Sequence, residues 1–178
     1  MTFDEVIKKR YSVRDYSERV VEQEKIEDIL KAGLLAPTAK NLQPEKIYVI
    51  KNGKYLEMIR EICPLIYNSN LIFLVCADKD IAWKNSKDGF DTTAMDTAII
   101  GTHMMLKATE LGLGTCWVRA FDVNEVKRTL NLPDSIIPEF ILLIGYPSEN
   151  AKPNEKLHYS RKNIDEVVEY LWRIVKNY

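Results

Sequence analysis

Two arginines and a serine near the N-terminus are spaced so that they could bind one anion. They belong to the segment Arg10-Tyr11-Ser12-Val13-Arg14, which lies between two predicted helices. In an extended segment alternate side chains point the same way, so Arg10, Ser12 and Arg14 would share a face. Guanidinium groups form charge-assisted, often bidentate hydrogen bonds with phosphate oxygens. The spacing alone fits a phosphate site and a solvated basic loop equally well.

A second group of polar side chains follows in a stiff loop. Residues 37–44 read Pro-Thr-Ala-Lys-Asn-Leu-Gln-Pro, so two prolines flank Thr38, Asn41 and Gln43. Proline limits the conformations that such a turn can adopt. Hydroxyl and amide groups form hydrogen bonds without carrying charge. We therefore expect this loop to contact the polar edge of an uncharged heterocycle.

The other reactive side chains do not form a metal-binding or nucleophilic pattern. The two histidines, His103 and His158, are far apart, and neither has a cysteine at ligand spacing. There is no Gly-x-Ser-x-Gly motif for a serine nucleophile. The Gly-x-Gly at 112–114 follows a predicted helix and precedes a strand, which is the reverse of the dinucleotide-binding fingerprint. We expect no metal site, and any chemistry should come from a cofactor.

The charge balance and the cysteine content indicate which kinds of partner the protein binds and in which compartment it lies. The chain has 178 residues, with 25 Lys plus Arg against 26 Asp plus Glu, a net charge of -1. Such a balance gives no overall field for nucleic acid or an anionic membrane, so anion binding must be local. Three cysteines without a Cys-x-x-Cys pair favour a reduced, cytoplasmic interior. No uncharged apolar run is long enough to span a bilayer. We expect one cytoplasmic domain over residues 1–178.

Helices and strands are predicted to alternate, which sets the frame for these side chains. Hydrophobic periodicity and capping residues predict helices at 2–9, 22–36, 91–111 and 122–130, a short helix after Gly53, and strands at 46–51, 71–77, 115–118 and 139–146. The run at 71–77 is continuously apolar, so it should be a central strand. A C-terminal helix is predicted with an apolar face of Val167, Val168, Leu171, Ile174 and Val175. This order is typical of an α/β or α+β sandwich.

Two elements carry open alternatives. Residues 98–106 are apolar on nearly every side of their helix, so we expect that helix to be buried all round, with a second subunit supplying the missing cover. Asp96 on the same helix fits a buried hydrogen-bonding hub or a first-turn interaction with the helix dipole, and we favour the dipole. The charged loop 78–90 contains Trp83 and Phe90, which fit local anchoring or a substrate lid, and anchoring is the more common role.

Four sequence blocks occur in a fixed order along the chain. They are Arg-x-Ser-x-Arg at 10–14, Ala-Pro-Thr-Ala-x-Asn-x-Gln-Pro at 36–44, Leu-Gly-Leu-Gly-Thr-Cys-Trp at 111–117 followed by Ala-Phe-Asp at 120–122, and Ile-Gly-Tyr-Pro at 144–147. In this order they resemble the nitroreductase family of FMN-dependent oxidoreductases. The resemblance implies an α+β sandwich with a central mixed β-sheet covered by helices. It also implies an intertwined homodimer in which residues 147–178 complete the cofactor site and the dimer.

The resemblance names FMN as the cofactor and gives roles to individual positions. Residues 10–14, assisted by Arg161, would hold the phosphate and ribityl end. The loop 37–43 would meet the isoalloxazine from across the dimer interface. A backbone N–H near Arg119 would face flavin N5, so no side chain is expected to be catalytic. The implied cofactor-binding set is Arg10, Tyr11, Ser12, Arg14, Pro37, Thr38, Ala39, Asn41, Gln43, Trp117, Val118, Arg119 and Arg161.

The function implied by the resemblance is a ping-pong flavin oxidoreductase. It would take hydride from NADH or NADPH and reduce a small-molecule electron acceptor such as a nitroaromatic or quinone. The alternatives are a flavin storage or sensing protein with little turnover, and a divergent branch that performs ene reduction, dehalogenation or flavin cleavage. Two positions depart from the family pattern: Glu45 replaces a common aromatic residue, and Arg119 a common glycine. The Arg119 side chain would either favour anionic acceptors, or face solvent or pair with an acid such as Asp122, and the second is favoured.

Overall fold

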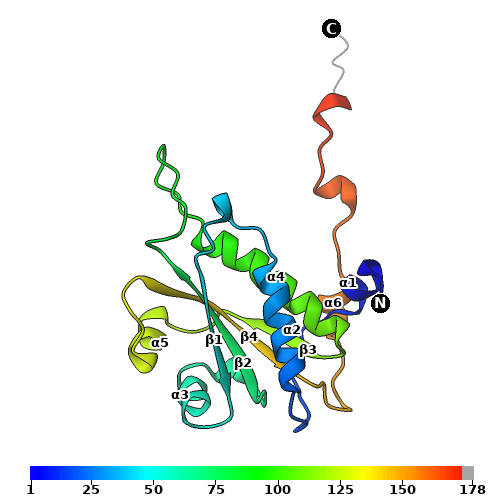
Figure 1. The fold of residues 1–178 in the computed structure, drawn as a ribbon. Coiled ribbons are helices and arrows are strands. Elements are labelled where there is room, and N and C mark those ends of the chain that lie inside the picture. Colours follow the sequence, from blue (N-terminus) through cyan, green and yellow to red (C-terminus); the bar gives the residue numbers. More distant parts are fainter. Residues whose placement is uncertain (174–178) are drawn as a thin grey trace.

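A four-stranded sheet lies at the centre of the fold in the computed structural model, which describes residues 1–173 (Figure 1). The strands are β1 (Glu45–Lys51), β2 (Leu71–Asp78), β3 (Gly114–Val118) and β4 (Ile136–Gly145), in the order β1-β2-β4-β3. All three neighbouring strand pairs are antiparallel. The expectation of a mixed sheet is therefore wrong for the described residues, in which one isolated bridge outside the sheet, between Ser12 and Thr115, is parallel. That bridge attaches the arginine segment to the edge strand β3.

Helices cover both faces of this sheet. Helices α2 (Gln23–Leu34) and α4 (Thr93–Glu110) lie on one face, and α3 (Lys54–Ile62) and α5 (Val123–Leu130) lie on the other (Figure 1). Strand β2 alternates between the two cores, because Phe73 packs toward α2 and α4 whereas Leu74 packs toward α3 and α5. Every residue of β2 from Leu71 to Ala77 is buried, so the predicted central strand is confirmed.

The shorter helices begin at capping residues that the sequence predicted. Thr2 and Glu5 form a reciprocal capping box at α1 (Phe3–Lys9), and Asp122 accepts a hydrogen bond from the Glu125 N–H at α5. Such bonds satisfy N–H groups that a helix start leaves free. The remaining elements are α6 (Glu155–Tyr159) and the 3₁₀ turns η1 (Ala39–Asn41), η2 (Pro64–Ile66), η3 (Ile164–Glu166) and η4 (Leu171–Arg173). Cys63, Cys76 and Cys116 are free and buried.

Helix α4 is not buried all round in the single chain, and its predicted burial with the help of a second subunit stays a prediction. Ile100 and Met104 are fully enclosed against the sheet and α2. On the opposite side the Met95 side chain is 52% exposed, Thr102 is exposed, and Ile99 is only partly buried. These positions recur at helical spacing and form one open apolar face. The single chain therefore leaves part of the apolar surface of α4 exposed to solvent.

The predicted C-terminal α-helix is also wrong over the residues that the structure describes. After α6 the chain leaves the body, and it forms only η3 and η4 before residue 174 (Figure 1). Leu171 and Trp172 are 72% and 76% exposed. An amphipathic helix draws most of its stability from packing its apolar face, and here the chain offers no surface for that face. Ile174 and Val175 lie outside the described residues.

None of the helices described in residues 1–173 is both long enough and apolar enough to cross a bilayer.

Candidate cofactor-binding site

Residues from both ends of the chain line one small polar cavity of about 60 Å³. Arg10, Ser12, Arg14 and Arg161, which the sequence analysis assigned to a phosphate, all line it together with Tyr11. The other lining residues are Asn154, Leu157 and His158 of the α6 region. The fold thus brings the four predicted polar residues together, although they lie about 150 residues apart in sequence. Their role toward a cofactor remains a prediction.

The arginine segment takes its shape from the edge strand beside it. The Val13 N–H donates to the Thr115 carbonyl at 2.9 Å, and Val13 is almost completely buried. The hydroxyl of Tyr11 donates to the Ala151 carbonyl at 3.3 Å. Because side chains alternate along an extended segment, burial of Val13 is consistent with Ser12 and Arg14 facing the cavity, which the partly buried Tyr11 lines as well.

The cavity is positively charged and its charges are not neutralised. Within residues 1–173 neither Arg10, Arg14 nor Arg161 forms an ion pair with a carboxylate. The guanidinium of Arg14 donates to the Ser12 carbonyl at 3.2 Å, and that of Arg161 to the Ser160 carbonyl at 2.7 Å. Three guanidiniums and a hydroxyl facing one small space fit a phosphate group, which accepts several charge-assisted hydrogen bonds at once.

The contribution of α6 to this cavity was not predicted from the sequence. Asn154 caps that short helix, because its side-chain oxygen accepts a hydrogen bond from the Leu157 N–H at 3.1 Å. His158 presents its ring edge-on to Tyr11, with the centroids 6.2 Å apart. The available signal was the asparagine N-cap, which places His158 on a helix three residues before Arg161.

The loop predicted to contact the flavin ring is held in an unusual backbone conformation. Lys40, Asn41 and Gln43 have φ angles of 52°, 55° and 51°, in the left-handed region that is uncommon for residues other than glycine. Thr38 fixes part of the turn, because its hydroxyl accepts the Gln43 N–H at 3.1 Å. Pro37, Asn41 and Gln43 are exposed, whereas Thr38 and Ala39 are partly buried.

Asp96 is a buried hydrogen-bonding hub, and the helix-dipole interpretation that the sequence favoured is wrong as its main role. Its side chain is 2% exposed. One carboxylate oxygen accepts the Ala39 N–H at 2.9 Å, and the other accepts the Thr92 hydroxyl at 2.8 Å. The hub was the less favoured of the two alternatives, because its partner Ala39 lies in a loop that the sequence pattern does not bring near the helix.

One chain does not bring the loop 37–44 to the arginine cavity. The loop is bonded to Asp96 near the start of α4, whereas Thr109 near the end of that helix borders the same small cavity as Arg10 and Val13. At about 1.5 Å per residue these two ends of α4 are separated by about 20 Å. The two halves of the predicted site are therefore at opposite ends of the helix (Figure 1).

The end of β3 and the residue that follows it carry the third set of predicted cofactor-binding residues, Trp117, Val118 and Arg119. The Trp117 ring stacks on Phe140, with centroids 3.5 Å apart and planes 17° apart, and Val118 is buried. Gly101 of α4 permits this stack, since a Cβ there would lie 2.4 Å from Phe140 and 2.6 Å from Trp117. Arg119 then leaves the strand with an exposed side chain.

The Arg119 side chain makes local contacts. Its guanidinium donates to the Phe121 carbonyl at 3.3 Å, and its central carbon lies 4.8 Å from the Phe121 ring centroid. Asp122, the suggested acidic partner, instead caps α5. Nearby, burial raises the pKa of the Glu139 carboxyl above its ordinary value, and the Thr93 hydroxyl and Arg119 oppose that rise.

Glu45 and the aromatic loop 79–92 both lie near the loop 37–44. Glu45, which departs from the family pattern, has one carboxylate oxygen buried without a hydrogen-bond partner within residues 1–173. In the loop 79–92 the carbonyl of Trp83 accepts the Thr92 N–H at 3.1 Å, and the Lys40 ammonium lies 5.8 Å from the Trp83 ring centroid. Trp83 is thus anchored locally. Phe90 at the other end of the loop is 53% exposed, and a lid role for it stays a prediction.

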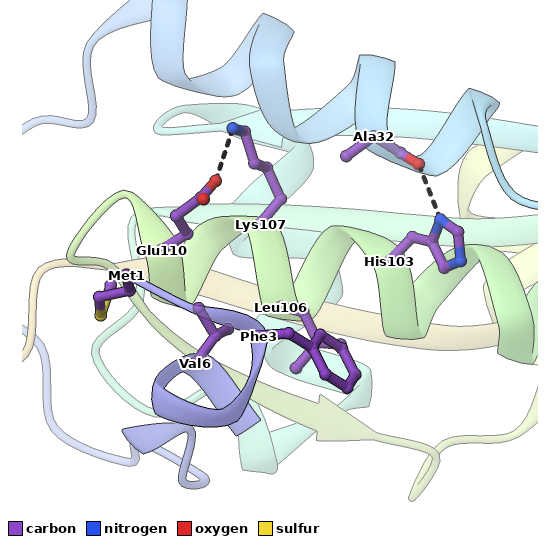
Figure 2. Close-up of a pocket in the computed structure, with 8 residues that line it drawn as sticks. All are labelled: Met1, Phe3, Val6, Ala32, His103, Leu106, Lys107 and Glu110. Atoms are coloured by element: carbon purple, nitrogen blue, oxygen red, sulfur yellow. Dashed lines mark hydrogen bonds and ion pairs between the residues drawn. The ribbon is translucent and has the colours of Figure 1, made fainter. Parts of the chain in front are cut away.

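A larger cavity, of about 350 Å³, lies between α1 and α4 and lacks the features of the candidate site. Figure 2 shows its lining, in which Phe3 and Val6 of α1 face Leu106 of α4. The imidazole Nδ1 of His103 lies 3.2 Å from the Ala32 carbonyl, and Lys107 pairs with Glu110 at 2.7 Å. The lining is mainly apolar and its one lysine is neutralised, so this cavity does not suit a phosphate.

Comparison with known proteins gives the same family as the sequence blocks. The Nitroreductase family matches residues 7–70 and 62–146. A protein of Methanothermobacter thermautotrophicus, provisionally named an NADH dehydrogenase/NAD(P)H nitroreductase, is 31% identical over 153 residues, covering 82% of this chain and 78% of the relative.

Solved structures extend the likeness to the whole fold. A nitroreductase family protein from Clostridium difficile 630 has a TM-score of 0.90 and 40% identity, covering 96% of this chain and 99% of its own. An FMN-dependent nitroreductase from Clostridium difficile R20291 has a TM-score of 0.74 and 28% identity, covering 93% and 97%. The family match spans most of the chain, and the fold agrees with it. This chain belongs to the nitroreductase family.

Proposed function

We propose that this protein is an FMN-dependent oxidoreductase that takes hydride from NADH or NADPH and reduces a small-molecule acceptor, such as a nitroaromatic or quinone, by a ping-pong mechanism. Family membership and the FMN dependence of one structural relative support this proposal. The observation that carries it is the cavity lined by Arg10, Ser12, Arg14 and Arg161, whose three guanidiniums have no carboxylate partner in the described chain.

The residues of this chain would act by binding and orientation. Arg10, Arg14 and Arg161 would neutralise the phosphate of FMN, and the Ser12 hydroxyl would donate a further hydrogen bond. When bound, FMN supplies the centre that accepts hydride from the nicotinamide and passes two electrons to the acceptor. The backbone N–H near Arg119 is the proposed donor to the N5 edge of the ring, where a fixed dipole stabilises the reduced form.

A homodimer would complete this site. The loop 37–44 and the arginine cavity lie at opposite ends of α4, so a second copy is the proposed source of the loop for each cavity. The same association would cover the open face of α4 around Met95 and Ile99, and the exposed side chains of Leu171 and Trp172. Burial of such apolar surface is the usual driving force for association. In this arrangement residues 147–178 would contribute both to the cofactor site and to the dimer.

The alternatives differ in what happens after flavin binds. A storage or sensing protein would hold FMN in the same arginine cavity but would show little turnover. A divergent branch would reduce an ene, remove a halogen or cleave flavin with the same binding residues.

The buried free cysteines support the expected cytoplasmic location, where thiols stay reduced.

Absorbance spectroscopy of the purified protein tests the proposal. We expect a bound-flavin spectrum that is bleached anaerobically by NADH, NADPH or both, and restored by a nitroaromatic or a quinone. Double-reciprocal plots for the two substrates should be parallel, as a ping-pong mechanism requires. A flavin that neither nicotinamide bleaches would favour storage or sensing. Failure of the protein to bind added FMN would overturn the proposal.

A further inference from the structure

A single buried carboxylate joins the proposed flavin-contacting loop to the start of α4. Asp96 lies in the first turn of α4, and its two carboxylate oxygens accept hydrogen bonds from different segments. The Ala39 N–H in the loop 37–44 bonds to Oδ1 at 2.9 Å, and the Thr92 hydroxyl bonds to Oδ2 at 2.8 Å. A carboxylate that is 98% enclosed is stable only when such donors compensate its desolvation.

The same carboxylate is linked to the aromatic loop 79–92. Thr92 is 4% exposed, and its N–H donates to the Trp83 carbonyl at 3.1 Å. Lys40, the residue after Ala39, places its ammonium 5.8 Å from the Trp83 ring centroid. These contacts form a closed set: Asp96 bonds to Ala39, the adjacent Lys40 lies near the Trp83 ring, and Thr92 bonds to both Trp83 and Asp96. Of the two charged side chains in this set, Asp96 is buried and Lys40 is exposed.

The loop needs an external anchor because its own backbone is strained. Three of the four residues from Lys40 to Gln43 have positive φ angles, and none of them is glycine. A residue held in this conformation is destabilised locally, and surrounding contacts must offset that cost. Within the loop the bonds are short-range, such as those from the Asn41 N–H to the Thr38 carbonyl and from the Leu42 N–H to the Ala39 carbonyl. At the end of the loop the Pro44 carbonyl accepts the Asp78 N–H of β2 at 2.7 Å. Within residues 1–173, the bond from Ala39 to Asp96 ties the start of the turn to a helix of the core.

We infer that Asp96 is a positioning residue that holds the loop 37–44 in its left-handed conformation, and against the loop 79–92, for contact with the flavin ring. The inference rests on the proposed function, because it assigns the loop to the ring. Asp96 itself need not touch the cofactor. Its effect would be to keep Thr38, Asn41 and Gln43 in the geometry that meets the ring, so that binding does not have to order them.

Substitutions at position 96 can be matched by a control five residues earlier. Asp91 also accepts two bonds, from the Thr93 N–H at 3.1 Å and the Thr93 hydroxyl at 2.6 Å, but neither comes from the loop 37–44. Asp96→Asn can keep accepting from Ala39 while its amide donates to the Thr92 hydroxyl, so it removes the charge and keeps the connection. Asp96→Ala removes both bonds. Asp91→Ala weakens the same end of α4 without releasing the loop.

The experiment measures dissociation constants for FMN and for riboflavin by quenching of flavin fluorescence. In Asp96→Ala we expect both affinities to fall tenfold or more, with the ratio between the two ligands unchanged, because the effect is on the ring and not on the phosphate. Asp96→Asn should recover part of this loss. Asp91→Ala should bind both flavins within twofold of the parent protein.

Hydrogen exchange of the apo proteins gives a readout that does not depend on flavin. Asp96→Ala should exchange faster over residues 38–43, whereas Asp91→Ala should leave those amides unchanged. Equal flavin affinities in Asp96→Ala and the parent would overturn the inference, as would an equal loss in Asp91→Ala. If the parent protein binds neither flavin, the proposed function fails first, and unchanged exchange over 38–43 in Asp96→Ala would refute the anchoring role separately.

Discussion

Val13 packs against Gly114 so closely that a Cβ at position 114 would lie 2.5 Å from the Val13 Cγ2 atom. This contact sets the arginine segment against β3, because the Val13 N–H also bonds to the carbonyl of the next residue, Thr115. A side chain at position 114 would therefore displace the segment that carries Arg10, Ser12 and Arg14.

Gly114→Ala should both destabilise the protein and weaken flavin binding. Forcing a methyl group into a packed site usually costs about 1–3 kcal/mol of unfolding free energy. Urea unfolding measures that change, and flavin fluorescence measures the affinity. The double variant Val13→Ala with Gly114→Ala removes the Cγ2 contact but keeps the Val13 Cβ, which would lie 2.8 Å from the new methyl group, so it should recover only part of the FMN affinity lost in Gly114→Ala. Unfolding free energy of Gly114→Ala within about 0.5 kcal/mol of the parent would show that the contact relaxes freely.

Arg10→Ala or Arg14→Ala should weaken FMN binding at least about tenfold, because each charge-assisted hydrogen bond contributes about 1.5–3 kcal/mol. Riboflavin lacks the phosphate, so its affinity should stay within twofold and serves as the control ligand. Fluorescence titration with both ligands checks the prediction. Unchanged FMN affinity in both variants, with the fold intact, would show that the segment is a solvated basic loop and not a phosphate site.

Oligomeric state and flavin retention should be linked. Ile99→Glu places a charge on the open apolar face of α4, and we expect it to shift the protein to monomers that lose FMN. Tyr55→Glu is the matched control, because Tyr55 is an exposed side chain on α3, across the sheet from α4. Analytical ultracentrifugation at the flavin wavelength follows both quantities. A stable parent monomer carrying stoichiometric FMN would contradict the dimer proposal.

Arg119→Gly should change the reduction of anionic and neutral acceptors by the same factor. The guanidinium is exposed and is turned toward Phe121, so it does not present a fixed charge to an acceptor. Steady-state kcat/KM for a carboxylated and an uncarboxylated quinone gives the comparison. A selective loss of activity toward the anionic quinone would instead assign the side chain to acceptor recognition.

Acid should weaken a network that ties α2 to the end of β4. The Tyr146 hydroxyl donates to Glu22 at 2.6 Å, and this bond, followed by backbone and Arg19 hydrogen bonds, lowers the pKa of Glu22 from about 4.5 to about 2. A carboxyl whose pKa is lower in the folded state stabilises it above pH 4.5, and that contribution disappears as the pH falls toward 2.

Glu22→Gln should therefore remove part of the acid dependence. Between pH 5 and pH 2 the urea midpoint of the parent should fall more than that of Glu22→Gln. Glu18→Gln on the same exposed segment has no bond to Tyr146 in the described structure and provides the control. Identical midpoint curves for the parent and Glu22→Gln would show that the pKa is not lowered in solution.

Local sequence signals predicted those parts of the fold that local physics decides. Capping residues gave the starts of α1 and α5, and the uninterrupted apolar run gave β2 as a central strand. The alternation at 10–14 predicted that Arg10, Ser12 and Arg14 lie together, and all three line one cavity, although Tyr11 lines it as well. The family resemblance supplied Arg161, which spacing alone could not connect with Arg10.

The wrong predictions concern features that depend on contacts distant in sequence or in another molecule. The periodicity of Val167 and Leu171 fits a helix, but a helical pattern does not supply a surface to pack against. The apolar residues of α4 predicted burial that includes a second subunit, and the single chain, which leaves Met95 exposed, does not test that part. Asp96 has the sequence position of a helix-dipole residue, and only the path of the loop 37–44 reveals its buried bond to Ala39.

The arginine cavity also has a consequence for biosynthesis. Arg10 and Arg161 are separated by about 150 residues, and at about 5–20 residues per second a ribosome needs on the order of 10 seconds or more to make the second after the first. Until then the N-terminal guanidiniums face no partner from α6. A nascent chain could therefore pack β1, β2 and α4 while its anion site is still open on one side. If the cavity binds FMN as proposed, all four strands of the sheet are synthesised before the residue that completes the site.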